Sequence, residues 1–358
     1  MPAEFLAEAT ALAEAFGIVS LITLVVFLVS LVMTRRLGQK LAWPWRHPRS
    51  PWTAWEIAWV FLSFLILPTV CSEFLEVAGW SSRNAVGGKR QVLDVAGEPL
   101  AAAGGCVAAA EQLARESTER QLRQIWGMAL SIPVIVGLGS YLRRDDRGAT
   151  RQPTWWPSFA IGALAWLPIA VMTFLVYLIC LGVMVLLDES PDSHPFVQLS
   201  LQESDWLSWL IFGLLVCVLG PGIEEWLFRG LILRWSIQHS LRPPIVLALA
   251  VLFGMLSGNP WAIVWSVTLL IAYPLLRGLA TALRPRFPRR IAGGIYASAA
   301  LFAAGHSLVW PSPVPLFVMG FLLGYLTART GSITAAWLVH GLFNAITYVY
   351  LLRGGATG

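Results

Sequence analysis

The chain has 358 residues, of which 57% are hydrophobic and only 13% are charged, and its formal net charge at pH 7 is +5. Soluble domains carry about a quarter charged residues, so this composition argues against a soluble fold. The positive charge comes almost entirely from arginines in short loops between apolar runs, which is typical of the cytoplasmic loops of membrane proteins and not of a nucleic-acid-binding surface. We therefore expect a multi-pass membrane protein that contacts the lipid bilayer and binds no nucleic acid.

Long apolar segments run through the whole chain, most of them of the length that a bilayer core requires. The candidate spans are residues 15–34, 52–71, 125–142, 157–187, 206–235, 244–257, 261–283, 291–309, 314–330 and 332–352. The 244–257 segment is short for a full crossing. The predicted fold is an all-α polytopic membrane helix bundle of about eight to ten transmembrane helices.

The first segment, 15–34, could be mistaken for a signal peptide. Acidic residues precede it where a signal peptide carries basic ones, and two arginines follow it with no small-residue cleavage site. We interpret it as a retained first helix. Basic clusters near 35–49, 143–151, 234–242 and 284–290 predict cytoplasmic loops and an N-terminus outside, in a multi-pass protein of the plasma (inner) membrane.

The organisation expected along the chain has two parts. Residues 1–205 form an N-terminal transmembrane region with a polar extramembrane loop at 72–124. Cys71 and Cys106 could form a disulfide in or near this loop, but no pair of cysteines has the spacing of a zinc site. Residues 206–352 form the second part, in which ionisable side chains lie within apolar runs at three places that stand out.

Two adjacent glutamates lie inside the apolar run 206–235, directly after a Gly-Pro-Gly sequence at 220–222. Ionisable groups within a membrane helix are costly and are candidates for function. Glu225 and Arg229 share one helical face and can neutralise each other, whereas Glu224 points about 100° away. We expect the proline to break or kink the helix and to leave free N–H groups near Glu224. Glu224 would then suit a general base, with a structural ion pair at a kink as the alternative.

Two further apolar segments carry histidines. Phe302 and His306 are four residues apart at the end of an alanine-rich run, so they share a helical face. His340 and Asn344 have the same spacing in the last apolar run. Taken alone, a histidine such as His306 is more often a hydrogen-bonded core residue than a catalytic one, and a hydrogen bond that packs helices together is the alternative for His340 and Asn344. Together with Glu224 they form a candidate polar site.

These three motifs resemble those of the CAAX-protease and bacteriocin-processing family, also called the Abi family, of intramembrane proteases, and in particular its type II CAAX prenyl endopeptidases. The family patterns are Glu-Glu-x-x-x-Arg, met by Glu224, Glu225 and Arg229; Phe-x-x-x-His, met by Phe302 and His306; and His-x-x-x-Asn, met by His340 and Asn344. Residues 315–332 also resemble the helix and turn that link the last two motifs. The resemblance covers about residues 206–352.

An atypical insertion near 240–290 separates the first two motifs, which a short connection usually joins in this family. Within it, residues 253–257 read Phe-Gly-Met-Leu-Ser and mimic the second motif with serine in place of histidine. We assign the second motif to His306, because the matching downstream helix follows it directly. An added helix pair over 244–283 would leave the core topology intact.

The resemblance implies hydrolysis of a peptide bond inside the membrane. Glu224, helped by His306, would activate a water molecule, and His340 and Asn344 would donate hydrogen bonds to the oxyanion. Glu225 and Arg229 would form a structural ion pair beside the positioning residue Phe302. Counting about 1.5 Å per residue from the predicted cytoplasmic ends does not bring Glu224 and the histidines to one depth, so we expect tilted or broken helices.

An older view of the family as metalloproteases implies a zinc ion instead. Glu225, His306 and His340 would then be its ligands, with Glu224 as the base. The motifs lack the HExxH spacing that fixes two ligands on one helix. We therefore prefer the metal-free mechanism and keep zinc as the alternative.

The expected substrate is a membrane-embedded or lipidated peptide or protein, of which a prenylated CAAX protein is one kind. A non-proteolytic role in bacteriocin immunity or as a membrane scaffold is the second interpretation, because an intact set of motifs does not prove that a substrate exists. A proton-coupled transporter is the third, since carboxylates and histidines inside a membrane also form proton relays. Against it, the two halves show no internal repeat.

Overall fold

A computed structural model of the chain describes residues 3–39, 52–77, 155–189, 206–238, 242–283 and 289–353, together with isolated positions between 123 and 137. The regular structure of these ranges is helical throughout, and they contain no strand. The predicted all-α fold is therefore confirmed. Most of the predicted span 125–142 and of the polar loop 72–124, including Cys106, lies outside the described residues.

The membrane-spanning character also agrees with the prediction. Six helices are long and apolar enough to cross a membrane, namely residues 10–36, 54–77, 155–186, 209–236, 313–330 and 333–352. Three shorter apolar helices lie at 242–256, 260–275 and 290–304. The chain is an integral, multi-pass membrane protein. Helix α2 (Ala54–Val77) extends past the predicted span, so residues 72–77 are helical and the polar loop begins later than we expected.

The chain divides into two compact units. The smaller one comprises residues 58–144 and 195–211, and within it Arg123 lies 3.2 Å from Glu76. The larger one comprises residues 1–57, 145–194 and 212–358. All the motif residues belong to the larger unit.

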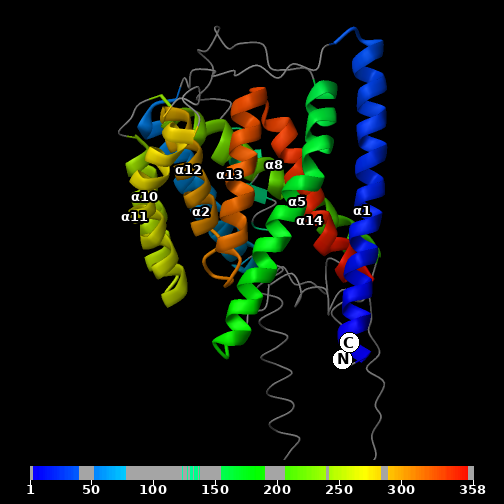
Figure 1. Cartoon of the computed structure of the whole chain (residues 1–358), viewed down its shortest axis with the longest axis horizontal. Helices are drawn as coiled ribbons and strands as arrows, with labels where there is room; N and C mark the ends of the chain where they lie inside the picture. The colour runs from blue at the N-terminus through cyan, green and yellow to red at the C-terminus, as the bar shows by residue number, and fades with distance from the viewer. Residues whose placement is uncertain are drawn as a thin grey trace, which may run out of the picture. The chain divides into compact units, whose positions relative to one another are not determined.

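Five helices organise the larger unit. Helix α1 (Ala3–Arg36) and helix α5 (Trp155–Leu186) pack against each other and against α14 (Ile333–Leu352), while α13 (Pro313–Thr330) lies between α5 and α12 (Arg289–Ala304) (Figure 1). In α13, 56% of the residues of the apolar span are buried, against 17% in α1. Helix α13 therefore lies inside the bundle, whereas α1 exposes most of its apolar surface.

A helix pair lies on the other side of α12. Helices α10 (Arg242–Leu256) and α11 (Pro260–Leu283) pack against each other and against α12 (Figure 1). They occupy the segment in which we expected an added helix pair. Ser257, the residue that mimics the second motif, donates from its hydroxyl to the carbonyl of Gly254 at the end of α10, 2.7 Å away.

The run that carries the glutamates is one continuous helix built from five segments. These are α7 (Trp206–Leu214), the π-helical turn η1 (Leu215–Leu219), α8 (Gly220–Glu225), the π-helical turn η2 (Trp226–Leu233) and α9 (Arg234–Ser236). The backbone at every described junction stays in the right-handed helical region. Of the two outcomes predicted for Pro221, a break or a kink, the break is therefore wrong, and the irregularity before the proline is the π-helical turn η1. The wider turn η1 accommodates the proline ring, which would clash with the carbonyl four residues earlier in a regular α-helix.

Candidate active site

A fully buried ion pair anchors the glutamate motif. Glu225 and Arg229 are each 0% exposed, and Arg229 Nη1 lies 2.9 Å from Glu225 Oε1. Arg229 Nη2 also donates to the carbonyl of Gly320 on α13, 3.2 Å away, and its guanidinium lies 4.5 Å from the centre of the Phe302 ring. These contacts connect η2 to both α12 and α13. The predicted structural ion pair is thus present, and it is shielded from water and lipid.

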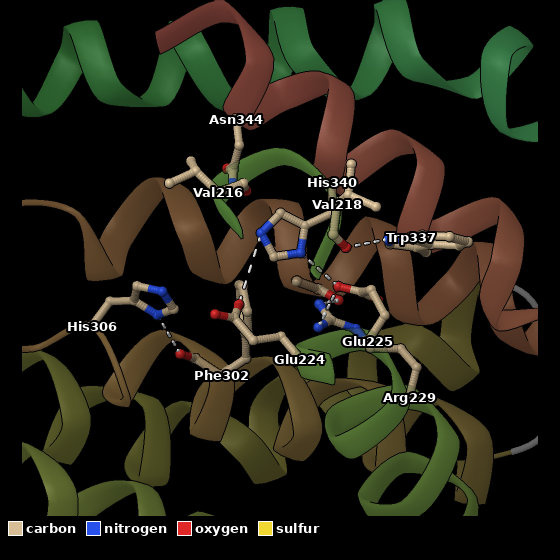
Figure 2. Close-up of polar contacts among 11 residues, drawn as sticks. Val216, Val218, Glu224, Glu225, Arg229, Phe302, His306, Trp337, His340 and Asn344 are labelled. Carbon is tan, nitrogen blue, oxygen red and sulfur yellow. Dashed lines mark hydrogen bonds and ion pairs between the residues drawn. The ribbon is translucent and has the colours of Figure 1, made fainter. Parts of the chain in front are cut away.

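His340 on α14 joins both glutamates. Its Nδ1 lies 2.9 Å from Glu225 Oε1, and its Nε2 lies 3.8 Å from Glu224 Oε2 (Figure 2). Because a carboxylate can only accept, the Nδ1 atom carries the proton of the shorter contact. The Nε2 atom is consequently turned toward Glu224. This contact of Glu225 with His340 was not predicted from the sequence, since 115 residues separate the two.

The two adjacent glutamates have different surroundings. Glu225 is sealed inside the bundle, whereas the side chain of Glu224 retains 21% of its exposure. In the view of Figure 2, the Glu224 carboxylate lies between the rings of His340 and His306. The structure thus pairs a sealed carboxylate, that of Glu225, with a partly accessible one, that of Glu224.

His306 lies just beyond helix α12, which ends at Ala304 and not at residue 309 as predicted. Its Nδ1 is 3.0 Å from the carbonyl oxygen of Phe302, so Nδ1 carries the proton and Nε2 is left as an acceptor. The Phe302 ring contacts both His306 and His340, with ring centres 5.0 and 5.6 Å apart. Phe302 is thus the common packing surface for the two histidines and the arginine.

Asn344 contacts the backbone of the glutamate-bearing helix. Its Nδ2 donates to the carbonyl of Val216 in η1, 3.0 Å away, and about two turns earlier on α14 the Trp337 indole N–H donates to the carbonyl of Val218, 2.8 Å away (Figure 2). This contact is the helix-packing hydrogen bond that we gave as the alternative for Asn344, so its role in the site stays a prediction. Trp337 was missed, because nothing in a single sequence distinguishes it from the other tryptophans.

The geometry does not favour the zinc alternative. In the part of the chain that the structure describes, no three His, Cys, Asp or Glu side chains converge on a point where they could hold a metal ion. Of the predicted ligands, Glu225 Oε1 already contacts Arg229 and His340. We therefore derive no chemistry through a metal from this arrangement.

Comparison with known families agrees with this site. The family model described as type II CAAX prenyl endopeptidase Rce1-like matches residues 206–278 and 273–346. Curated proteins and solved structures give no significant match. The matched range contains all three motifs, and their side chains lie in the geometry described above.

Proposed function

We propose, from the premise that this chain belongs to the CAAX protease family through residues 206–346, that it cleaves its substrate with a water molecule activated by Glu224. The family makes the chain a CAAX-type intramembrane endopeptidase. The proposal concerns the catalytic type and the substrate. The observation that carries it is a row of four side chains in which basic and acidic groups alternate: Arg229, Glu225, His340 and Glu224. The successive contacts along this row are 2.9, 2.9 and 3.8 Å long.

The first step is attack by water. Glu224 accepts a proton from the water, while His306 Nε2 accepts a hydrogen bond from its other O–H and orients it. The water oxygen then forms a bond to the scissile carbonyl carbon, and the carbonyl oxygen becomes an oxyanion. The partial exposure of Glu224 supports this role, because a fully sealed carboxylate would not reach a water molecule.

The second part of the mechanism stabilises the oxyanion and releases the products. His340, held at Nδ1 by Glu225, donates from Nε2 in its doubly protonated form, and Asn344 donates the Nδ2 hydrogen that the Val216 carbonyl does not use. Glu224 returns its proton to the leaving amine as the C–N bond breaks, which restores the carboxylate. Glu225 and Arg229 keep His340 in place and do not react.

The proposed substrate class is a membrane-associated, prenylated protein or peptide, because the family acts on C-terminal CAAX sequences. The test uses purified protein in lipid vesicles, a farnesylated CAAX peptide and the same peptide without the lipid. Wild type is expected to cleave the lipidated peptide. The Glu224→Gln variant should lose at least about 10³-fold in rate, because it has no base to take the proton.

The matched control is Glu189→Gln, an exposed glutamate just after α5, which should leave the rate unchanged. A metal chelator should not reduce the wild-type rate; a loss that zinc restores would favour the metalloprotease alternative. A survey of peptide termini in membranes expressing wild type or Glu224→Gln at matched levels extends the test to unknown substrates. Identical termini in both would contradict the proposal and favour an immunity or scaffold role.

A further inference from the structure

The π-helical turn η1 leaves one backbone carbonyl, that of Val216, without its helical donor. In this turn the N–H of Gly220 bonds to the carbonyl of Leu215, five residues back. In the same pattern the Val216 carbonyl would accept a hydrogen bond from the N–H of residue 221, but Pro221 has no N–H. The proline therefore removes the partner of a carbonyl that lies within a membrane-spanning helix, where water is absent.

Helix α14 supplies the missing donor for Val216, and a donor for Val218 as well, from one face. Asn344 donates to Val216, as described above, and Trp337 donates to Val218. Between them lies Gly341, and a side chain at this position would overlap the Cys217 carbonyl oxygen. Positions 337, 341 and 344 follow the i, i+4, i+7 spacing of a single helical face. The three consecutive carbonyls 216–218 thus lie directly against α14.

Gly222 lies beside the indole of Trp337. A Cβ atom at Gly222 would lie 3.2 Å from Trp337 Nε1, so the glycine leaves room for the ring beside α8. Val218 and Glu224 belong to the same continuous helix, and Trp337 and His340 belong to α14. The Trp337 bond therefore fixes the helix that carries the candidate base against the helix that carries its histidine partner.

The Glu224–His340 contact depends on such external support. The two side chains are 3.8 Å apart, beyond the length of a good hydrogen bond, so the contact does not set its own geometry. We propose that Trp337 is a positioning residue that holds Glu224 at its working distance from His340 through the hydrogen bond to Val218. This inference extends the proposed function and rests on it for its kinetic part.

The test separates the hydrogen bond from the ring. Trp337→Phe keeps an aromatic ring and removes the donor, whereas Trp337→Gln removes the ring and returns an N–H at similar reach. The matched control is Trp166→Phe on α5, because Trp166 is a buried indole whose N–H has no partner among the described residues. We expect Trp337→Phe to lower kcat about ten-fold with KM unchanged, since a displacement of about 1 Å at a reacting group can cost about 10²-fold.

The deciding result is which of the two Trp337 variants has the higher kcat. Positioning through the hydrogen bond requires Trp337→Gln to retain a higher kcat than Trp337→Phe; the reverse order would mean that Trp337 only fills space and would overturn the inference. Trp166→Phe should keep the wild-type kcat. A rise in KM without a fall in kcat at position 337 would also overturn the inference, because it would indicate a role in substrate binding.

A second readout needs no substrate. With ¹⁵N-labelled histidine, the His340 imidazole signals can be assigned among the five histidines by loss in a His340→Gln variant. Trp337→Phe should shift the His340 Nε2 signal, Trp337→Gln should restore it in part, and Trp166→Phe should leave it in place. An unmoved signal in Trp337→Phe overturns the inference. If wild type cleaves no peptide, the proposed function fails, and the imidazole signals alone decide whether Trp337 positions the pair.

Discussion

Two regions of the larger unit use their polar side chains in opposite ways. In α1 and α5, hydroxyl groups bond within their own helix, as Thr23 does to Val19 and Thr173 to Ile169. These helices meet through ring contacts instead, such as Phe16 with Trp166 at 5.4 Å. Around the candidate site, polar side chains bond across helices: Ser298 donates to the carbonyl of Phe228, Arg229 to Gly320, Trp337 to Val218 and Asn344 to Val216.

The difference shows where this protein needs exact geometry. Lipid tails are as apolar as leucine, so apolar contacts between membrane helices give little preference for one arrangement over another. Hydrogen bonds between helices are directional and fix distance and rotation. They occur where two glutamates and two histidines must meet, whereas α1 and α5 can tolerate small shifts.

The strongest test of this contrast is the buried ion pair. Arg229→Met leaves the Glu225 charge buried with only His340 beside it, and we expect the free energy of unfolding to fall by about 3–5 kcal/mol. The free energy of unfolding is measured in mixed micelles by adding increasing amounts of a denaturing detergent. If the free energy of unfolding fell by less than about 1 kcal/mol, the Glu225 charge would still be compensated in the variant.

The next test compares two glycines. Gly341→Ala should lower the free energy of unfolding by about 1–3 kcal/mol and reduce cleavage, because the new methyl group pushes α14 away from Cys217. Gly182 on α5 has no heavy atom near the position of an added Cβ. Gly182→Ala should therefore be neutral or stabilise by up to about 1 kcal/mol, as expected for a helix interior. Equal effects at the two positions would contradict the proposed difference between the candidate-site region and the α1–α5 region.

A smaller effect is expected for the hydroxyl groups. Ser298→Ala removes a 2.9 Å hydrogen bond between α12 and η2, and should reduce the free energy of unfolding by about 0.6–1.5 kcal/mol. Thr173→Val removes a bond within α5 only, and its effect should stay near zero. Thermal unfolding of both variants beside wild type measures the difference. Matching losses would show that bonds between helices have no special weight.

The smallest effect is expected for an exposed ion pair that joins the two regions. Arg353 lies 3.7 Å from Glu14, and both side chains are about half exposed, at 52% and 53%. Arg353→Met should change the free energy of unfolding by no more than about 0.5 kcal/mol, since solvent screens such pairs. The same denaturation assay as for Arg229 applies. A loss as large as that of Arg229→Met would mean that α1 is held by charge and not by its ring contacts.

The residues themselves were sufficient to predict much of the molecule. Run length identified the membrane helices, because a bilayer core demands about 20 apolar residues regardless of how the helices pack. The spacing of four residues correctly paired Glu225 with Arg229, since that contact lies within one helix. The three motifs led to the family that the match over 206–346 supports. What these inferences share is that each depends on local sequence alone.

The tertiary structure decided what connects distant segments. The sequence predicted that Pro221 would break or kink its helix and leave free N–H groups; instead the helix continues through the π-helical turn η1, and the Val216 carbonyl accepts its hydrogen bond from Asn344 on α14. Only packing could choose between these outcomes, because the donor lies more than a hundred residues away. For the same reason the bond from Glu225 to His340 and the role of Phe302 between two histidines emerged only once α8, α12 and α14 were brought together.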